Sequence, residues 1–307
     1  MTKPIFIISL DLELGWGFIS NPGHKALRLL RNDAQCGRGV IELLLTLFQR
    51  YNIPATWAAV GHLYMEQGEG EKWISRELPQ FENGWLNWDF YSQICDSPLY
   101  SAPDIITKIS ASPVTHEISL HSFFHTPFSL CSHAVAKLEV ELGMNVARQR
   151  GIEPQSFVFP ENHVGHLDAL RGAGIEIYRG NVPRLYNKAA APFIRKATGA
   201  INKVMPPSVL PLWEEGIWEI PGSMSFDDPL MSFTLLPRAK AGLKRAIRAD
   251  KVFHVWLHPW SLLVHRGLSD DLESFLAFVS QKRDKGNLQV MTMGDLATKT
   301  YGRRSLL

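Results

Sequence analysis

Residues 5–13 read IFIISLDLE, and their alternation decides how the chain is expected to fold. Side chains two positions apart lie on the same face of a β-strand, so the apolar residues at the even positions share one face. Ser9 and Asp11 share the opposite face, and Glu13 follows them at the same parity. The pattern predicts a strand whose apolar face is covered by helices and whose polar face points inward.

Two later segments, residues 117–121 and 252–257, alternate in the same way. The polar face of the first ends in His121, and the polar face of the second leads to His258. Barrel enzymes build their sites from polar side chains at the carboxyl ends of inward-facing strands. The repetition on three strands favours such a site over the simple capping of strand ends by ionisable residues.

The rest of the chain predicts an α/β fold. Short β-rich runs alternate with helical patterns, which is typical of βα units around a mostly parallel sheet or barrel. A chain of 307 residues with 45% hydrophobic content can bury a large core, so we expect a single domain over residues 1–307. Strands are expected at residues 5–10, 55–60, 117–121, 156–159, 176–178, 218–220, 252–257 and 288–292, and helices at 39–50, 133–150, 167–173, 239–249 and 270–283. Two long irregular stretches, near 67–103 and 186–211, are expected to be insertions over the active face.

Composition limits the classes of partner. The net charge is only +2, so no broad surface for nucleic acid is expected. Lys and Arg are denser in residues 184–203 and 238–251, where they form either solvated helix faces or contacts with an anionic substrate or a membrane surface. The three cysteines share no metal-like spacing, which favours a reducing compartment over a disulfide framework.

The chain shows no pattern typical of a targeting or transmembrane segment. The apolar run at the N-terminus is closed by Asp11 and is too short for a signal-peptide core. No stretch approaches roughly 18 uninterrupted apolar residues. These features predict a cytoplasmic protein without a transmembrane segment, with peripheral contact at the inner face of the membrane as an open alternative.

Residues 119–128, SLHSFFHTPF, place two imidazoles four positions apart at the end of an expected strand. His121 and His125 converge on one ion if the segment turns helically after the strand. Asp11 and Glu13 can supply a third ligand and a separate base. Two imidazoles and one carboxylate leave positions open for water and substrate, the pattern of catalytic zinc sites. Taken alone, however, a histidine pair at this spacing is more often a surface or packing feature.

Five segments, taken together, resemble the motifs of the polysaccharide deacetylases of the carbohydrate esterase type. They are SLDLELGWG (residues 9–17), HEISLHSFFH (116–125), FVFPEN (157–162), WEIPGS (218–223) and VWLHP (255–259), in the order and spacing of that family. The resemblance runs over most of the chain. It implies a distorted (β/α) barrel with about seven strands and a divalent metal ion, usually zinc.

The resemblance also implies roles for individual residues. Asp11 would be the general base, and His258 the acid that protonates the leaving amine. Glu13, His121 and His125 would be the metal ligands. The backbone N–H near Glu161 would help to hold the oxyanion. Trp218 would form one wall of the sugar pocket, with simple core packing as the equal alternative.

Two departures from the family pattern call for compensation elsewhere in the chain. Glu13 stands where many members have an Asp, so the ligand is longer by one methylene. Val158 stands where many members have the Arg that orients the base. Three residues are candidates to replace that Arg, either beside the base or at the substrate: Asn162, His163 and Arg179.

The sequence thus predicts a metal-dependent hydrolase that removes an N-acyl group, expected to be acetyl, from an amino sugar or glycan precursor. The absence of a signal peptide favours a nucleotide-linked or lipid-linked intermediate, which the basic residues Arg195 and Lys196 are expected to contact. Two alternatives stay open. One is an amidohydrolase for a small non-sugar amide, and the other is a catalytically silent glycan-binding protein of the same fold.

Overall fold

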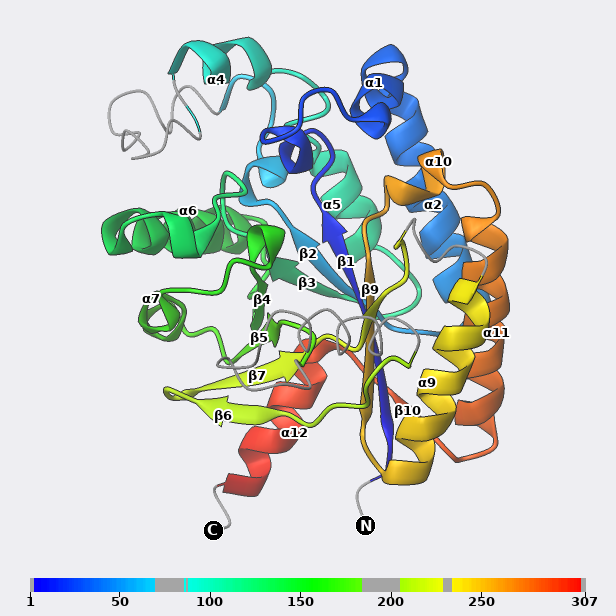
Figure 1. The fold of residues 1–307 in the computed structure, drawn as a ribbon. Coiled ribbons are helices and arrows are strands. Elements are labelled where there is room, and N and C mark those ends of the chain that lie inside the picture. Colours follow the sequence, from blue (N-terminus) through cyan, green and yellow to red (C-terminus); the bar gives the residue numbers. More distant parts are fainter. Residues whose placement is uncertain (1–2, 70–85, 87, 184–204, 229–233, 305–307) are drawn as a thin grey trace, which may run out of the picture.

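The structure, a computed structural model, describes residues 3–69, 86, 88–183, 205–228 and 234–304 (Figure 1). Parts of both expected insertions, residues 70–85 and 184–204, lie outside the described residues, as do Arg195 and Lys196. The strands are β1 (Ile5–Leu12), β2 (Thr56–Ala59), β3 (Glu117–Leu120), β4 (Ser156–Val158), β5 (Ile177–Gly180), β6 (Leu212–Glu214), β7 (Ile217–Pro221), β8 (Met224–Ser225), β9 (Val252–Leu257) and β10 (Gln289–Val290). The α-helices are α1 (Lys25–Asn32), α2 (Ala34–Tyr51), α4 (Trp88–Ile94), α5 (Pro103–Ser110), α6 (His133–Gln149), α7 (Leu167–Gly172), α9 (Leu235–Ala249), α10 (Ser261–Val264), α11 (Leu268–Asp284) and α12 (Met293–Arg304).

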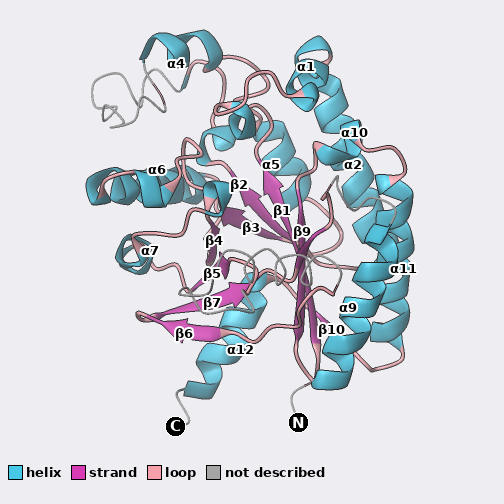
Figure 2. Ribbon diagram, viewed as in Figure 1, coloured by secondary structure: helices cyan, strands magenta, loops and turns pink. Residues whose placement is uncertain are grey.

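The strands form one curled sheet in the order β6-β7-β5-β4-β3-β2-β1-β9-β8, and β10 pairs with β1 (Figure 2). All neighbours are parallel except β6 and β7, which form an antiparallel pair. A bridge between Val209 and Val252 joins the segment before β6 to the start of β9, across the opening of the sheet. The expected distorted (β/α) barrel is therefore confirmed. The short strands β6 and β8 were not expected.

The two faces of the sheet divide as the alternation predicts. Phe6, Ile8 and Leu10 belong to the large apolar cluster between the sheet and its helices. The inward residues Ile5 and Ile7 belong to a second apolar cluster, which also includes residues of α12. Apolar side chains thus make up much of the amino-terminal half of the barrel, beside polar groups such as Glu117, which accepts hydrogen bonds from Thr56 Oγ1 and the Gly294 N–H.

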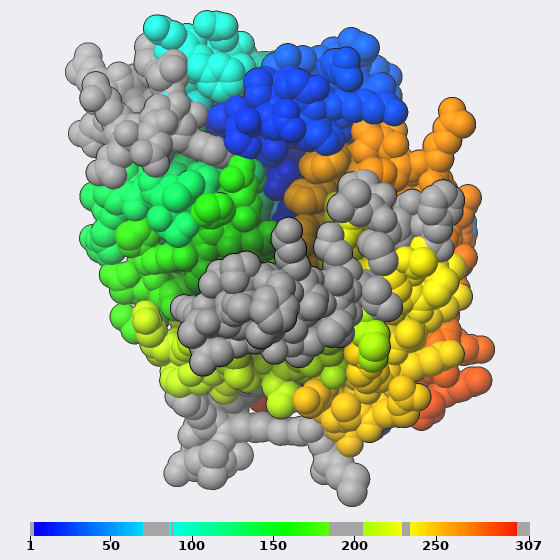
Figure 3. All heavy atoms as spheres, viewed as in Figure 1, coloured from blue at the N-terminus to red at the C-terminus, as the bar shows by residue number. Residues whose placement is uncertain are grey.

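The carboxyl ends of the strands form the mouth of the barrel. Figure 1 shows α1 and α4 beyond this end of the sheet. In the space-filling view, the surface is hollowed between the blue N-terminal, green and orange segments (Figure 3). In the described part of the chain, no helix is both long enough and apolar enough to cross a membrane.

Candidate metal centre and catalytic site

The end of β1 places two carboxylates at the barrel mouth. Asp11 lies within β1, and Glu13 follows directly after the strand; both are buried. The backbone then reverses through Leu14, whose φ of 48° lies in the left-handed region, and Trp16 donates its N–H to the Glu13 carbonyl. This tight turn keeps the segment after Glu13 against the site.

The loop after β3 carries the two histidines. His121 is fully buried directly after the strand, and His125 lies on the loop with a φ of 60°. Glu139 of α6 holds this loop, because its carboxylate accepts the N–H groups of Phe123 (2.7 Å) and Phe124 (2.9 Å). The expected helical turn is therefore replaced by a loop fastened to α6, and the two imidazoles still converge.

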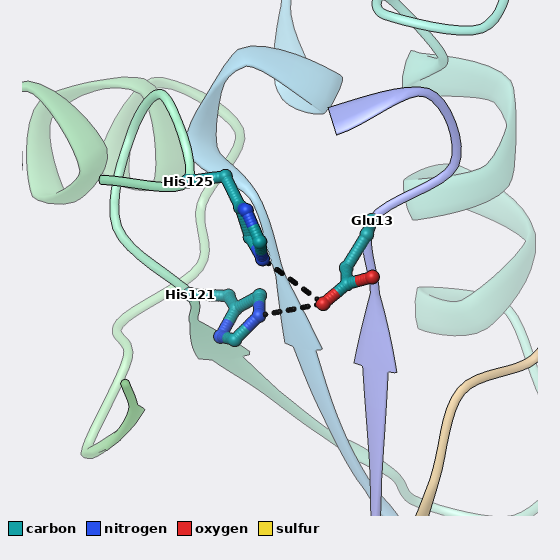
Figure 4. Close-up of side chains that lie close together, drawn as sticks. All are labelled: Glu13, His121 and His125. Carbon is teal, nitrogen blue, oxygen red and sulfur yellow. Dashed lines mark hydrogen bonds and ion pairs between the residues drawn. The ribbon is translucent and has the colours of Figure 1, made fainter. Parts of the chain in front are cut away.

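Glu13, His121 and His125 meet in one buried group (Figure 4). Glu13 Oε1 lies 3.1 Å from His121 Nε2 and 3.0 Å from His125 Nε2. His121 Nδ1 lies 2.8 Å from the Val158 carbonyl oxygen and must donate its proton there. In the neutral ring, the unprotonated Nε2 then points its lone pair at a carboxylate oxygen. A cation bound between the two atoms would replace this repulsion with attraction. Two imidazoles and one carboxylate are a donor set that suits zinc and related divalent ions.

The hold of Glu139 on the histidine loop gives a direct prediction. Glu139→Leu removes both acceptor oxygens and leaves the Phe123 and Phe124 N–H groups without their carboxylate partner, so we expect the free energy of unfolding to fall by about 1–3 kcal/mol. Zinc affinity should fall as well, because His121 and His125 flank the loosened segment. Urea unfolding and zinc titration measure the two effects. Glu141→Leu, at an exposed position of the same helix, is the matched control and should change neither.

Asp11 is paired with an arginine from a different strand than the family pattern uses. Arg179 of β5 donates to both Asp11 oxygens, Nη1 to Oδ1 at 2.5 Å and Nη2 to Oδ2 at 2.6 Å. In the sheet, Arg179 is the register partner of Val158, the residue at the position of the missing arginine. The guanidinium thus comes from the neighbouring strand, at the same level of the barrel as the position where the family pattern has its arginine.

Further groups hold Arg179 in place. Its Nη1 also donates to Ser9, its Nη2 to Asn162 Oδ1, and its guanidinium lies 4.6 Å from the centre of the Trp256 ring. Burial raises the pKa of Asp11, but the Arg179 guanidinium, together with His121 and His258, outweighs burial, and the pKa lies below its usual value. Arg179 therefore lies against Asp11, the predicted base, and its role at the substrate stays a prediction.

His258 follows β9 and faces both carboxylates. Its Nε2 lies 3.6 Å from Glu13 Oε1 and 3.9 Å from Asp11 Oδ2. Asp227 Oδ2 accepts from His258 Nδ1 (2.8 Å) and from the His258 backbone N–H (2.9 Å). Burial lowers the pKa of His258, but the Glu13, Asp227 and Asp11 carboxylates outweigh burial and raise it to about 10. The ring is thus held with Nε2 directed at the site.

The structure does not bring every predicted residue to the mouth. The Glu161 side chain is exposed and accepts a hydrogen bond from Ser20 Oγ (2.7 Å), while its backbone has a φ of 52°. Its backbone N–H as an oxyanion donor stays a prediction. Trp218 pairs with Ile177 near the start of β7 and packs against Trp213 and the lower apolar cluster. It lies a layer below Arg179, so its side chain packs in the core rather than at the mouth.

Three residues of the site were not predicted from the sequence. Glu139 and Asp227 reach the site from helical and loop segments that show no polar alternation. Trp260 donates its indole N–H to Glu13 Oε2 at 3.3 Å. The sequence could have indicated Trp260, because it stands two residues after His258, next to the motif of residues 255–259. For Asp227 only the acidic pair of residues 227–228 marked the loop.

No protein-family model matches this sequence, and no curated protein matches it. Solved structures do resemble the fold. A putative polysaccharide deacetylase from Mycobacterium smegmatis is 14% identical with a TM-score of 0.64, over 99% of this chain and 92% of that chain. A probable polysaccharide deacetylase from Pseudomonas aeruginosa PAO1 is 13% identical with a TM-score of 0.62, over 97% and 90%. PuuE allantoinase is 13% identical with a TM-score of 0.61, over 97% and 90%. The chain therefore has the fold seen in structures described as polysaccharide deacetylases.

Proposed function

We propose that the protein is a metal-dependent hydrolase that removes an N-acyl group, with acetyl as the expected group, from an amino sugar or glycan intermediate. One observation carries the proposal. The three-ligand group of Glu13, His121 and His125 lies beside Asp11 and His258, whose Nε2 is within 4 Å of both carboxylates. Three candidate metal ligands, a candidate base and a candidate acid thus lie together at the mouth of the barrel.

The ion belongs with Glu13, His121 and His125. Asp11 is not needed as a ligand, because Arg179 already engages both of its oxygens. A divalent ion at this position would lower the pKa of a bound water and polarise the acyl carbonyl. Zinc is the expected ion from the resemblance, and the two imidazole nitrogens favour it over calcium or magnesium.

The residues of the chain would perform the proton transfers. Asp11 would take the proton of the attacking water, since the buried guanidinium keeps the carboxylate ionised and oriented. His258 would pass a proton from Nε2 to the departing amine, with Asp227 holding Nδ1. A bound cation would offset the negative charge of Glu13 and weaken its effect on His258. Asp227 would still stabilise the charged His258 imidazole.

The carrier of the sugar is a proposal from the sequence alone. A nucleotide-linked or lipid-linked diphosphate would suit the basic stretches, one of which includes Arg195 and Lys196. A cytoplasmic location, with contact at the inner face of the membrane, belongs to the same proposal. A panel of free, nucleotide-linked and lipid-linked N-acetylated sugars compares these substrates directly.

Metal content is the first test of the proposed function. We expect about one equivalent of a divalent ion in protein purified without chelator or histidine tag, and loss of that ion in His121→Ala/His125→Ala. Elemental mass spectrometry measures the ion, and acetate release from N-acetylated sugars measures the activity. His133→Ala removes an exposed imidazole elsewhere and should keep both. Wild-type protein that binds no zinc, even after zinc is added, would rule out the metal centre.

A further inference from the structure

The two oxygens of the Glu13 carboxylate have different surroundings. Oε1 faces the imidazoles of His121 and His125. Oε2 points the other way and accepts the indole N–H of Trp260 at 3.3 Å. A carboxylate with one oxygen held in this way presents the other oxygen alone to an ion.

Gly17 closes the space behind Oε2. A Cβ atom at this glycine would lie 1.9 Å from Glu13 Oε2 and 2.7 Å from Glu13 Cδ. Gly17 is not among the glycines with positive φ, so its backbone conformation is open to any residue. The requirement for glycine here is therefore steric: the carboxylate occupies the place of a side chain.

Trp260 is itself held by a cluster of aromatic rings. It stacks on His258 with ring centres 4.8 Å apart and an angle of 29° between the planes. Phe18 (5.1 Å) and His24 (5.0 Å) pack against it from the segment after Gly17. The ring cannot turn its N–H away from Glu13 without disturbing these contacts.

We infer that Trp260 and Gly17 are positioning residues that restrict Glu13 to one ligand oxygen, an inference that rests on the proposed metal centre. The extra methylene of Glu13, relative to the Asp of the family pattern, is accommodated by seating Oε2 between the Gly17 backbone and the indole. Oε1 is then the oxygen that faces the Nε2 atoms of His121 and His125. A single carboxylate oxygen leaves more of the coordination sphere for water and the acyl oxygen than a bidentate carboxylate would.

The test measures zinc affinity by competition with a chromophoric chelator on the full-length chain. Trp260→Phe keeps an aromatic ring and removes the N–H, and Gly17→Ala pushes on Oε2 directly. Partners behind the metal ligands typically contribute 10- to 100-fold in affinity, so each variant should bind zinc roughly 10- to 100-fold more weakly. Trp213→Phe makes the same change at a ring that packs against Trp218 away from the mouth, and it should stay within about threefold of wild type.

A double variant shows whether both residues act through the same oxygen. If they do, Trp260→Phe/Gly17→Ala should lose little more zinc affinity than the weaker-binding single variant. The reason is that either single change already disturbs the position of Oε2, so the second change adds little. Cobalt-loaded protein gives an independent readout. Its visible absorption should weaken in Trp260→Phe as a second carboxylate oxygen raises the coordination number.

The outcomes separate this inference from the proposed function. His125→Ala is the reference variant for the site. If His125→Ala loses zinc while Trp260→Phe and Gly17→Ala bind like wild type, the metal centre stands and the positioning role is overturned. If His125→Ala binds zinc like wild type, the metal centre fails and the positioning role fails with it. Thermal unfolding of each variant confirms that the chain is folded when affinity is measured.

Discussion

Asp11→Asn should lower kcat for deacylation by about 10²- to 10⁴-fold, the range for loss of a positioned general base. The amide keeps the size of the carboxylate and an oxygen for Arg179, but it cannot take a proton from the attacking water. Asp11 also belongs to a second possible ligand group, with Glu13 and His258, but Arg179 engages both of its oxygens, so zinc content should stay close to one equivalent. The loss is therefore expected in kcat, with metal binding intact.

Steady-state acetate release, measured well below the unfolding temperature of the variant, gives the comparison. Asp168→Asn is a suitable control, since that carboxylate is exposed and pairs with His133 on the surface. A kcat for Asp11→Asn within about threefold of wild type would mean that another group takes the proton. Loss of zinc together with activity would mean instead that Asp11 is a ligand.

Arg179→Leu should lower the free energy of unfolding by about 3–5 kcal/mol, because it leaves the Asp11 carboxylate buried without its counter-charge. Arg179 is fully buried, and both of its terminal nitrogens contact Asp11. Urea unfolding with linear extrapolation measures the change. Arg179→Lys keeps the charge but not the paired geometry, and an intermediate loss is expected.

Two comparisons isolate the buried charge as the cause. Arg38 and Asp104 form a similar two-point pair at 2.7 and 2.9 Å, with the Asp104 side chain 45% exposed. Arg38→Leu should therefore cost only about 0–1 kcal/mol. Asp11→Asn/Arg179→Leu should be less destabilised than the sum of its single variants, because a neutral amide does not require the guanidinium. Additive losses would show that Arg179 acts through packing alone.

Local periodicity was sufficient for most of the long elements of the fold. The strand over Val252–Leu257 has the expected ends, and five expected helices correspond to α2, α6, α7, α9 and α11. Helix α12 was missed because few of its residues are apolar, and these face the interior of the barrel rather than following a surface helix pattern. Its one local signal was the pair Thr292 and Asp295, whose side chains cap each other's backbone N–H groups.

The site, too, has residues that local sequence predicts and partners that only the fold decides. The alternation of neighbouring residues predicts which face of the sheet carries Asp11, His121 and His258. The sequence alone therefore predicts that these three residues point inward. It does not predict the partners of these residues, because the polar atoms that hold them come from distant parts of the chain. Arg179 lies 168 residues from Asp11, and Asp227 lies 31 residues from His258.

Alternation between neighbouring residues therefore predicted the strands and their inward polar face, since backbone geometry makes those features local, and the motif resemblance added the distorted barrel and the proposed metal ligands. Sheet order and register decided the rest. They placed Arg179 beside the position of Val158, brought the loop of Asp227 behind His258, and left Trp218 in the lower core. The physical reason is that a buried charge is stabilised by whichever group packing brings within hydrogen-bond distance, and that group is chosen by the fold as a whole.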